Sequence, residues 1–261
     1  MVDHSALDDL ALSVVTAARN EAGNVAEFLL RTGQAFELLK INGEVIFIDD
    51  GSVDGTDEVV RQFIEGAQGD FKVTLIRHDE SRGLAAAILD GVRAATGNLI
   101  CFLPSDLESH PDADIPLLYN ALDPLHDVVA GCRLGRDDKK TISSAIANSG
   151  FRILFGHRWR DANWIKLARR KVLHGLYLRD NWHSFLLPIL HSRGCRIREV
   201  ETEWHRRRYG QSKFGWRRFH RSIVGALGVK LHLLFSGRTR SVRVYDAPST
   251  TSAGAKRSFF E

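Results

Sequence analysis

The sequence of 261 residues predicts an α/β fold, with a mainly parallel sheet flanked by helices and an amphipathic helix near the C-terminus. Three observations favour this class. Strand-like and helix-like segments alternate at the spacing of βαβ units. The run at residues 45–49 is apolar and β-branched, as in a strand buried on both faces, and ends in carboxylates and a glycine-rich turn. A hydrophobic fraction of 44% allows a sizeable core.

In the first half of the chain, predicted strands and helices alternate regularly. Short apolar or alternating runs predict strands at residues 12–16, 45–49, 71–77 and 99–103. Longer segments with helical spacing, the third of them alanine-rich, predict helices between these strands at residues 24–39, 56–65 and 84–95. Each helix therefore connects two strands that we expect to run parallel.

The second half contains further elements of both kinds. The same patterns predict strands at residues 128–132 and 197–204 and helices at residues 142–155, 182–191 and 214–235. We expect one domain over residues 1–213, the amphipathic helix at 214–235, and a disordered tail at 236–261. That tail is rich in Ser, Thr, Ala and Arg, which cannot build a packed core.

Charge is distributed unevenly along the chain. The net charge is only +4, but the first 130 residues are acid-rich and residues 133–240 are strongly basic. This asymmetry predicts that the second half binds an anionic partner. The partner could be a phosphate group, a lipid surface or nucleic acid.

The cysteines and the N-terminus favour an intracellular protein. Cys101, Cys132 and Cys195 are odd in number and lie in apolar runs, so we expect reduced core thiols. Residues 1–9 are polar and acidic and show no pattern of a signal peptide. No apolar run approaches the ~20 residues that a membrane span requires.

Two loops follow the first and second predicted strands. Asp50 lies in the acidic turn after the second strand, and its type suits a ribose hydroxyl, a base edge or a metal better than a phosphate. The loop at residues 17–24 follows the first strand. Asn20 in that loop either caps the next helix or lies with Asp50 against a nucleotide base.

Two further motifs follow later strands. Gly83 opens an alanine-rich helix, a pattern that close packing alone explains. Asp106 and Glu108 follow the buried run at residues 99–103 and provide the oxygen ligands that Mg²⁺ or Mn²⁺ prefers. The alternative is that Asp106 caps a turn and Glu108 is solvated. We favour a metal beside a diphosphate, because three strand ends converge there.

Taken together, these residues resemble the family-2 glycosyltransferases with a GT-A fold, and within them the dolichol-phosphate mannose synthase-like enzymes. The resemblance extends from about Leu12 to Gly228. The segments that carry it are residues 18–21, 48–56, 83–85, 106–107, 128–133 and 207–213. It implies inverting transfer of a sugar from a UDP- or GDP-sugar to a polyprenyl phosphate. It also implies a peripheral position on the cytoplasmic face of a membrane.

The resemblance implies a role for each matching residue. The residues expected to bind the nucleotide-sugar donor are Ala18, Arg19, Asn20, Glu21, Asp50, Gly83 and Ser105. Asp106 corresponds to the second acid of the Asp-x-Asp metal motif, and Glu108 to a third oxygen ligand. The residues expected to hold the acceptor phosphate are Arg133, Lys139 and Ser143, and those of the closing basic loop are Arg207 and Lys213.

The chain departs from the family pattern at three places. Pro104 replaces the first acid of the metal motif, and Ala17 replaces the proline near the end of the first strand. The acid often found in the acceptor helix has no equivalent at residues 182–188. Pro104 leaves three outcomes open: a weaker metal site, a basic side chain in place of the metal, or lost activity.

The reaction itself constrains the catalytic groups. Transfer leaves negative charge on a nucleoside diphosphate, which a divalent ion or clustered cations must stabilise. Asp106, Glu108, Arg207 and Lys213 are the candidates. A phosphate acceptor needs no general base, because its second pKa is about 6. Asp161 is the reserve candidate for a base or a sugar-positioning group, and it could equally cap a turn before Trp164.

The stretch at residues 205–221 is basic with interleaved aromatic residues. It fits nucleic acid, a solvated basic face, or an anionic lipid surface. We favour the lipid surface, because apolar residues follow it at helical spacing, and the acidic strand ends argue against nucleic acid. The same helix could instead pack on the domain or on a second copy in a homo-oligomer. The rival functions are transfer to a saccharide or another lipid, and a silent nucleotide-sugar-binding domain.

Overall fold

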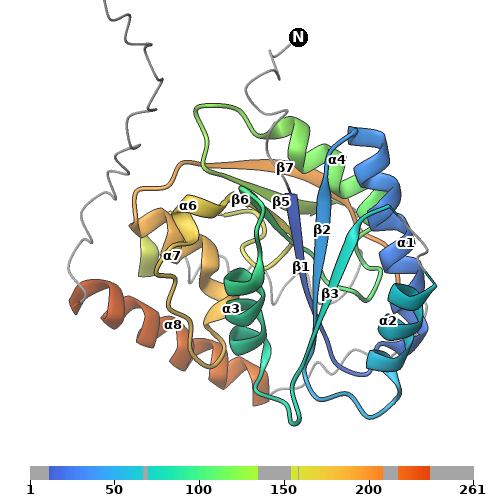
Figure 1. Ribbon diagram of the computed structural model, residues 1–261. Coiled ribbons are helices and arrows are strands. Elements are labelled where there is room, and N and C mark those ends of the chain that lie inside the picture. Colours follow the sequence, from blue (N-terminus) through green and yellow to red (C-terminus); the bar gives the residue numbers. More distant parts are fainter. Residues whose placement is uncertain (1–11, 67–69, 135–153, 158, 208–216, 236–261) are drawn as a thin grey trace, which may run out of the picture.

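The computed structural model describes residues 12–66, 70–134, 154–157, 159–207 and 217–235. These residues form one seven-stranded sheet with helices on both of its faces (Figure 1). The predicted helix at 142–155 and the tail from residue 236 lie largely or wholly outside the described residues.

The sheet is mainly parallel, as predicted. Its strands, in chain order, are β1 Leu12–Ala18, β2 Gly43–Asp49, β3 Lys72–Arg77, β4 Leu99–Phe102, β5 Val128–Leu134, β6 Lys166–Arg169 and β7 Ile197–Glu203. They are arranged in space as β3-β2-β1-β4-β6-β5-β7. Only β6 is reversed among them, because it pairs antiparallel with both β4 and β5. All other strands therefore end at the same edge of the sheet, here called the carboxyl edge.

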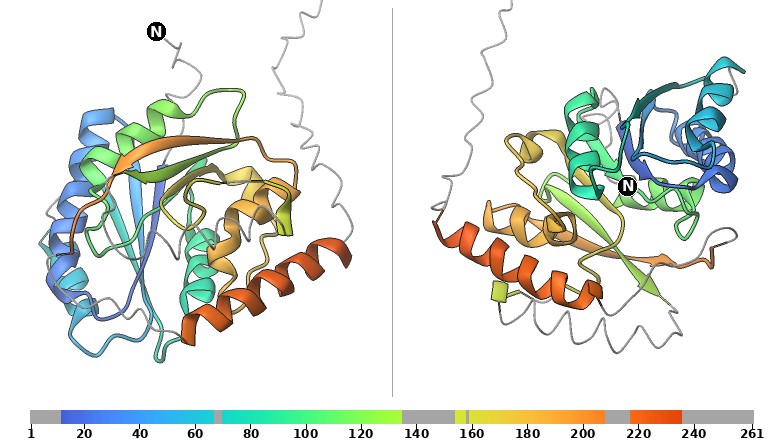
Figure 2. Two further views of the ribbon diagram at one scale, coloured as in Figure 1. Left: turned by 180° about the vertical axis from the view of Figure 1, so that it is seen from behind. Right: turned by 90° about the horizontal axis from the view of Figure 1, so that it is seen from below.

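Helices cover the two faces of the sheet as separate layers (Figures 1 and 2). One face packs against α1 (Ala22–Leu39), α2 (Thr56–Glu65) and α4 (Pro111–Ala121). The other face packs against α3 (Leu84–Ala94), α6 (Arg170–Leu173) and α7 (Leu186–Ser192), which continues the 3₁₀ turn η1 (Trp182–Phe185). Side chains along β1 alternate between the layers, with Val14 in the first and Val15 in the second.

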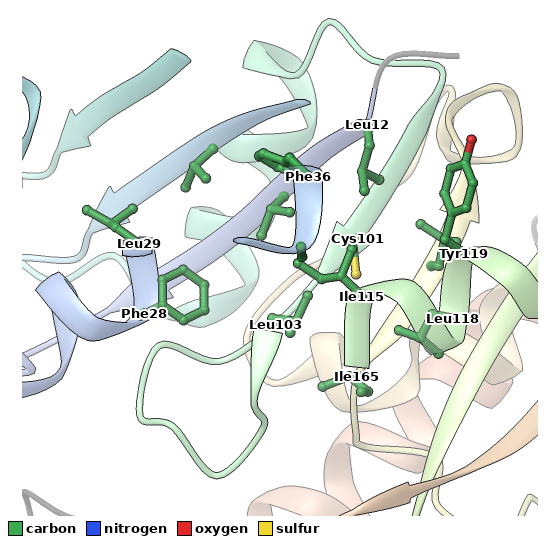
Figure 3. Packing of buried hydrophobic residues seen from close by; sticks show 14 of the residues in the cluster. Leu12, Phe28, Leu29, Phe36, Cys101, Leu103, Ile115, Leu118, Tyr119 and Ile165 are labelled. Carbon is green, nitrogen blue, oxygen red and sulfur yellow. The ribbon is translucent and has the colours of Figure 1, made fainter. Parts of the chain in front are cut away.

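The first layer holds the larger core. Phe28 and Leu29 of α1 and Ile115 and Leu118 of α4 are fully buried or nearly so against the sheet, where Cys101 of β4 lies between them (Figure 3). Each such side chain contributes about 1.5–3 kcal/mol to folding. The three cysteines are all buried, as expected, and burial raises the pKa of the Cys101 thiol.

Three elements were not predicted. The strand β6 was missed because charged Lys166 and Arg169 bound a run of only four residues. The helix α4 carries Pro111 and Pro116, and a proline inside a helix normally argues against one. Pro111 lies at the first helical turn, where its missing N–H costs nothing. The short helix α6 has too few residues for a periodic pattern.

The C-terminal helix α8 (Arg217–Phe235) packs on the domain through one face (Figure 2). Ala226 and Val229 are buried against Trp182 and Phe185 in a small cluster of their own. No helix in the described part of the chain combines the length and apolar character needed to cross a membrane.

Gly91 sets the distance between α3 and the sheet. A Cβ atom there would collide with Val15 Cγ1 and lie 2.8 Å from Ile48 Cδ1. Alanine would gain ~1 kcal/mol of helix propensity but would overpack a rigid sheet at a cost of ~1–3 kcal/mol. We expect Gly91→Ala to lower the free energy of unfolding by about 1 kcal/mol in urea titrations.

Gly228 in α8 provides the matched control. A Cβ atom there would lie 3.7 Å from the Trp182 ring, which is ordinary van der Waals contact. Gly228→Ala should therefore be neutral or stabilising. A stabilised Gly91→Ala variant would show that α3 can move away from the sheet at little cost.

Candidate active site

The carboxyl edge brings together, from distant parts of the chain, those predicted site residues that the structure describes. β1, β2 and β4 end there, at the loops that carry Asn20, Asp50 and Asp106. Since β6 is antiparallel to both of its neighbours, β5 and β7 also end at this edge. Arg133, near the end of β5, and Arg207, just after β7, therefore face the same region.

The loops after β1 and β2 are joined by hydrogen bonds. The backbone N–H of Asn20 donates to Ser52 Oγ at 2.9 Å, and Asn20 Oδ1 accepts from the Val53 N–H at 3.0 Å. Glu21 donates its N–H to Thr56 Oγ1 at 3.0 Å. Glu21, not Asn20, occupies the N-cap position of α1, so the interpretation of Asn20 as a helix cap is wrong. These hydrogen bonds hold the loop after β1 against the loop after β2.

Asp50 organises the loop before α3. Its two oxygens accept hydrogen bonds from Ser81 Oγ (2.7 Å) and from the N–H groups of Arg82 (2.8 Å) and Gly83 (3.0 Å), and His78 Nδ1 lies 2.8 Å away. Burial raises the pKa of Asp50, but these hydrogen bonds outweigh it and hold the pKa below its usual value. Its lone pairs are thus in use within the protein, and Gly83 follows at a positive φ of 84°.

Arg19, Ala18 and Ser105 are the remaining residues that the sequence predicts to bind the donor. Arg19 is exposed at the end of β1, and the Ala18 carbonyl accepts the Asp50 N–H at 2.9 Å. Ser105 is only 3% exposed and lies within the loop that follows β4. Of residues 18–21, which lie at the carboxyl edge, only Arg19 is therefore exposed.

Asp106 is a buried carboxylate in a tight turn. It is 7% exposed, its Oδ1 accepts the Glu108 N–H at 3.1 Å, and Leu107 between them has a positive φ of 58°. Burial raises the pKa of Asp106 to about 6, with Arg207 lowering it in part and Glu108 raising it. The carboxylate needs positive charge near it to stay ionised.

Arg207 supplies that charge. Its Nη2 lies 2.5 Å from Asp106 Oδ2, and its Nε donates to Glu108 Oε1 at 2.8 Å. Burial lowers the pKa of Arg207, but the two carboxylates outweigh that effect and raise it overall. The alternative of a solvated Glu108 is therefore wrong, whereas the turn held by Asp106 is present.

The segment that carries Arg207 is anchored next to Glu108. His205 donates its N–H to the Glu108 carbonyl at 3.0 Å, and its ring stacks on His110 with centroids 3.5 Å apart. This contact fixes where the chain leaves β7. Neither histidine was predicted, because only the fold brings the two together.

A divalent cation would suit this position in one respect only. Asp106 and Glu108 offer the oxygens that Mg²⁺ or Mn²⁺ prefers, but Arg207 holds one oxygen of each. Within the described residues, no three His, Cys, Asp or Glu side chains gather as a metal site. The two carboxylates fit a metal only once Arg207 has moved away and a substrate supplies further oxygens.

A second charged cluster lies at the end of β5. Arg133 forms a bidentate pair with Asp161, with Nε–Oδ2 at 2.6 Å and Nη2–Oδ1 at 3.0 Å, and its guanidinium lies 4.5 Å from the Trp164 ring centre. Lys166 is buried beneath it, and burial lowers the pKa of Lys166 to about 8, against the opposing effect of Asp161. Lys166 was not among the predicted site residues. The one signal for its burial is that its neighbours in the sequence are apolar.

The remaining predicted site residues are Asp161, which the structure describes, and three residues that it does not. Both Asp161 oxygens are held by Arg133, so neither is free to act as a base. Lys139, Ser143 and Lys213 lie outside the described residues.

Comparison with known proteins gives consistent results. The model of a family described as "Glycosyl transferase family 2" matches residues 13–173. The undecaprenyl-phosphate 4-deoxy-4-formamido-L-arabinose transferase of Aeromonas hydrophila is 31% identical over 209 residues, covering 78% of this chain and 63% of the relative. The dodecaprenyl-phosphate galacturonate synthase of Rhizobium johnstonii is 28% identical over 239 residues, covering 89% and 70%. This chain thus spans less than two thirds of the first relative's length.

Solved structures share the fold. Mannosyl-3-phosphoglycerate synthase from Rubrobacter xylanophilus superposes with a TM-score of 0.70 at 16% identity, covering 91% of this chain and 78% of that one. A mannosyltransferase from Pyrobaculum calidifontis, solved with GDP-Man and Mn²⁺, gives a TM-score of 0.62 at 20% identity, covering 85% and 64%. The predicted GT-A fold is confirmed.

Proposed function

The chain belongs to glycosyl transferase family 2, and we propose that it transfers a sugar from a UDP- or GDP-sugar to a polyprenyl phosphate. The observation that carries the proposal is the meeting of Asp106, Glu108 and Arg207 at the edge where the donor loops also end. The acceptor class is supported by two relatives named for undecaprenyl and dodecaprenyl phosphate. Inverting stereochemistry follows from the family resemblance.

On the donor side, the nucleoside lies against residues 18–21 and the loop that Asp50 holds. Its diphosphate then reaches Arg207, whose guanidinium exchanges its carboxylate partners for phosphate oxygens. A guanidinium binds both kinds of oxygen in the same forked geometry. Asp106 and Glu108, released by that exchange, would hold Mg²⁺ or Mn²⁺, which supplies positive charge to the leaving diphosphate.

On the acceptor side, the chain needs no general base. A phosphate monoester is largely ionised at neutral pH, so its oxygen attacks the anomeric carbon as the bond to the diphosphate breaks. Asp161 pairs with Arg133 and orients it toward this phosphate. The Trp164 ring, which contacts the Arg133 guanidinium, fixes the plane of that group. Lys139, Ser143 and Lys213 remain further candidates for phosphate contacts.

The outer face of α8 supports a membrane position. Five apolar side chains on it are between 47% and 69% exposed: Ile223, Val224, Leu227, Leu231 and Leu234. Their spacing puts them on one stripe, while Ala226 and Val229 pack on the domain. We propose that the stripe lies on the membrane that contains the lipid acceptor.

Charges placed on this stripe should release the protein from membranes. We expect Leu227→Asp/Leu231→Asp to lower co-sedimentation with liposomes by about tenfold or more, because two carboxylates would enter the interface. The control is Leu38→Asp/Leu125→Asp, at side chains 68% and 61% exposed on other elements. Undiminished binding of the α8 variant would show that another surface contacts the membrane.

Product formation tests the function directly. A panel of UDP- and GDP-sugars with undecaprenyl phosphate, in Mg²⁺, Mn²⁺ or EDTA, should yield one lipid-linked sugar. Activity that survives EDTA would assign the charge stabilisation to Arg207 rather than to a metal. Nucleotide binding without turnover on any acceptor would instead favour the silent nucleotide-sugar-binding domain, which Pro104 and the occupied carboxylates both suit.

A further inference from the structure

A cavity of about 720 Å³ lies on the α3 side of the sheet, away from the carboxyl edge. Its floor is the start of β4 at Asn98 and Leu99, and its walls are α3 and the segment from Arg169 to Leu176. Asp106 follows the opposite end of β4, which rises ~3.3 Å per residue. The cavity is therefore separate from the candidate active site.

Four cations line this cavity: Arg93, Arg169, Arg170 and Lys171. No Asp or Glu is among its described lining residues. Arg93 pairs with Asp90 at 2.7 Å. For the other three, no carboxylate in the described part of the chain lies within 4.0 Å, the limit for an ion pair.

Backbone carbonyls hold two of these guanidinium groups in place. Arg169 donates to the carbonyls of His126 (3.2 Å) and Asp123 (3.1 Å), and Arg170 donates to that of Thr96 (3.0 Å). A carbonyl orients a guanidinium but does not cancel its charge. By contrast, Arg133 and Arg207 of the candidate active site are paired with carboxylates. The Arg169 side chain points away from the α3 face, because its neighbour Ala168 lies on that face. The positive charge of the cavity that lacks a counter-ion is therefore that of Arg170 and Lys171.

The rest of the lining is apolar. Leu89 and Val92 of α3 and Leu173 of α6 face the cavity together with Leu176. Leu89 and Leu176 also pack against the cluster in which α8 is anchored through Val229. A small inorganic anion would gain nothing from these side chains, whereas the hydrocarbon next to a lipid headgroup would.

We propose that this cavity binds the phosphate headgroup of an anionic lipid, with the basic side chains on the phosphate and the leucines on the first part of its acyl chain. Guanidinium and ammonium groups form charge-assisted hydrogen bonds with phosphate. The site would hold the protein on an anionic membrane beside α8 and independently of sugar transfer.

Calorimetric titration of the full chain with a short-chain phosphatidic acid, kept below its micelle concentration, tests the proposal. Without a bilayer, the outer face of α8 has nothing to bind. We expect saturable binding that is at least about tenfold tighter than that of inorganic phosphate or of the matching phosphatidylcholine. Equal affinity for inorganic phosphate would overturn the lipid assignment, and absence of phosphatidic acid binding would overturn the site.

Variants locate the binding. Lys171 is exposed, and Lys171→Glu should weaken binding about tenfold with an unchanged melting temperature. Lys40→Glu makes the same charge change at the end of α1 and should leave affinity unaltered. Arg133→Gln should also keep binding, which separates this cavity from the acceptor site. Loss of binding in Arg133→Gln but not in Lys171→Glu would place the lipid at the active site instead.

Discussion

Asp106→Asn is expected to lower the rate of sugar transfer by about 10²-fold or more while the protein becomes no less stable at pH 7. Asparagine keeps the shape of the side chain and its turn with Glu108, but it cannot hold a cation as an anion does. The loss should therefore appear in kcat with little change in donor affinity.

The stability part of this prediction follows from the raised pKa. Burial raises the pKa of Asp106 to about 6 in the folded state, above the usual value of 3.8, so ionisation opposes folding. Protonated Asp106 therefore favours the folded state. This contribution to the free energy of unfolding is fully present below pH ~4 and is lost as the pH rises through 6, so that the free energy of unfolding is about 3 kcal/mol lower at pH 7. Asp114 of α4, whose pKa burial also raises to about 6, adds to the same trend.

Thermal unfolding and single-turnover assays across pH 4 to 8 measure both effects. The wild type should unfold at a higher temperature near pH 5 than at pH 7, and Asp106→Asn should flatten that difference. Glu37→Gln, at an exposed acid of α1, is the control and should change neither. Near-normal turnover of Asp106→Asn would remove this carboxylate from the mechanism.

Arg207→Gln is expected to reduce transfer by about 10²–10³-fold and, at the same time, to tighten binding of Mn²⁺ in the absence of donor. The first effect follows because the leaving diphosphate loses its cation. The second follows because Asp106 and Glu108 regain the oxygens that Arg207 occupies in this structure. A purely structural role for Arg207 would lower activity without improving metal affinity.

Mn²⁺ titration followed by electron paramagnetic resonance, beside rate measurements, distinguishes these cases. Arg207→Lys should recover part of the rate, since it keeps the charge but not the forked geometry. Arg206→Gln removes an exposed neighbouring arginine and should have a much smaller effect. If Arg207→Gln bound Mn²⁺ no better than the wild type, the two carboxylates would not be a latent metal site.

Much of the fold was predictable because its strands are local patterns. The runs that became β1, β2, β4 and β5 are apolar over nearly their whole length, which marks strands buried on both faces. The strand β6 was not predictable, because four residues bounded by cations give no period. Its antiparallel direction depends on the strands on either side of it rather than on its own sequence.

The site was predictable as a set of residues but not as an arrangement. The resemblance placed Asp106, Glu108 and Arg207 in one site, yet nothing in the sequence indicated that Arg207 would hold both carboxylates, of which Glu108 lies 99 positions away along the chain. That contact depends on β7 pairing beside β5 and on the stacked His110 and His205 rings. The saturated hydrogen bonding of Asp50 likewise arises only when the loop after β3 folds over it.

The reversed strand β6 has a consequence for how this family can diversify. β5 reaches the carboxyl edge at Leu134, and β6 starts from that same edge at Lys166. The chain therefore leaves and re-enters the sheet at one edge, so an insertion or deletion between these two strands need not shift the register of either, since closing a longer loop costs little free energy. The buried residues Trp159, Ala162 and Ile165 would have to be kept, because they belong to the core. Lys139, Ser143 and Asp161 all belong to this connection. On the proposed function, a change of acceptor would therefore be confined to the exposed part of this one connection, while the loops after β1, β2 and β4 stay constant.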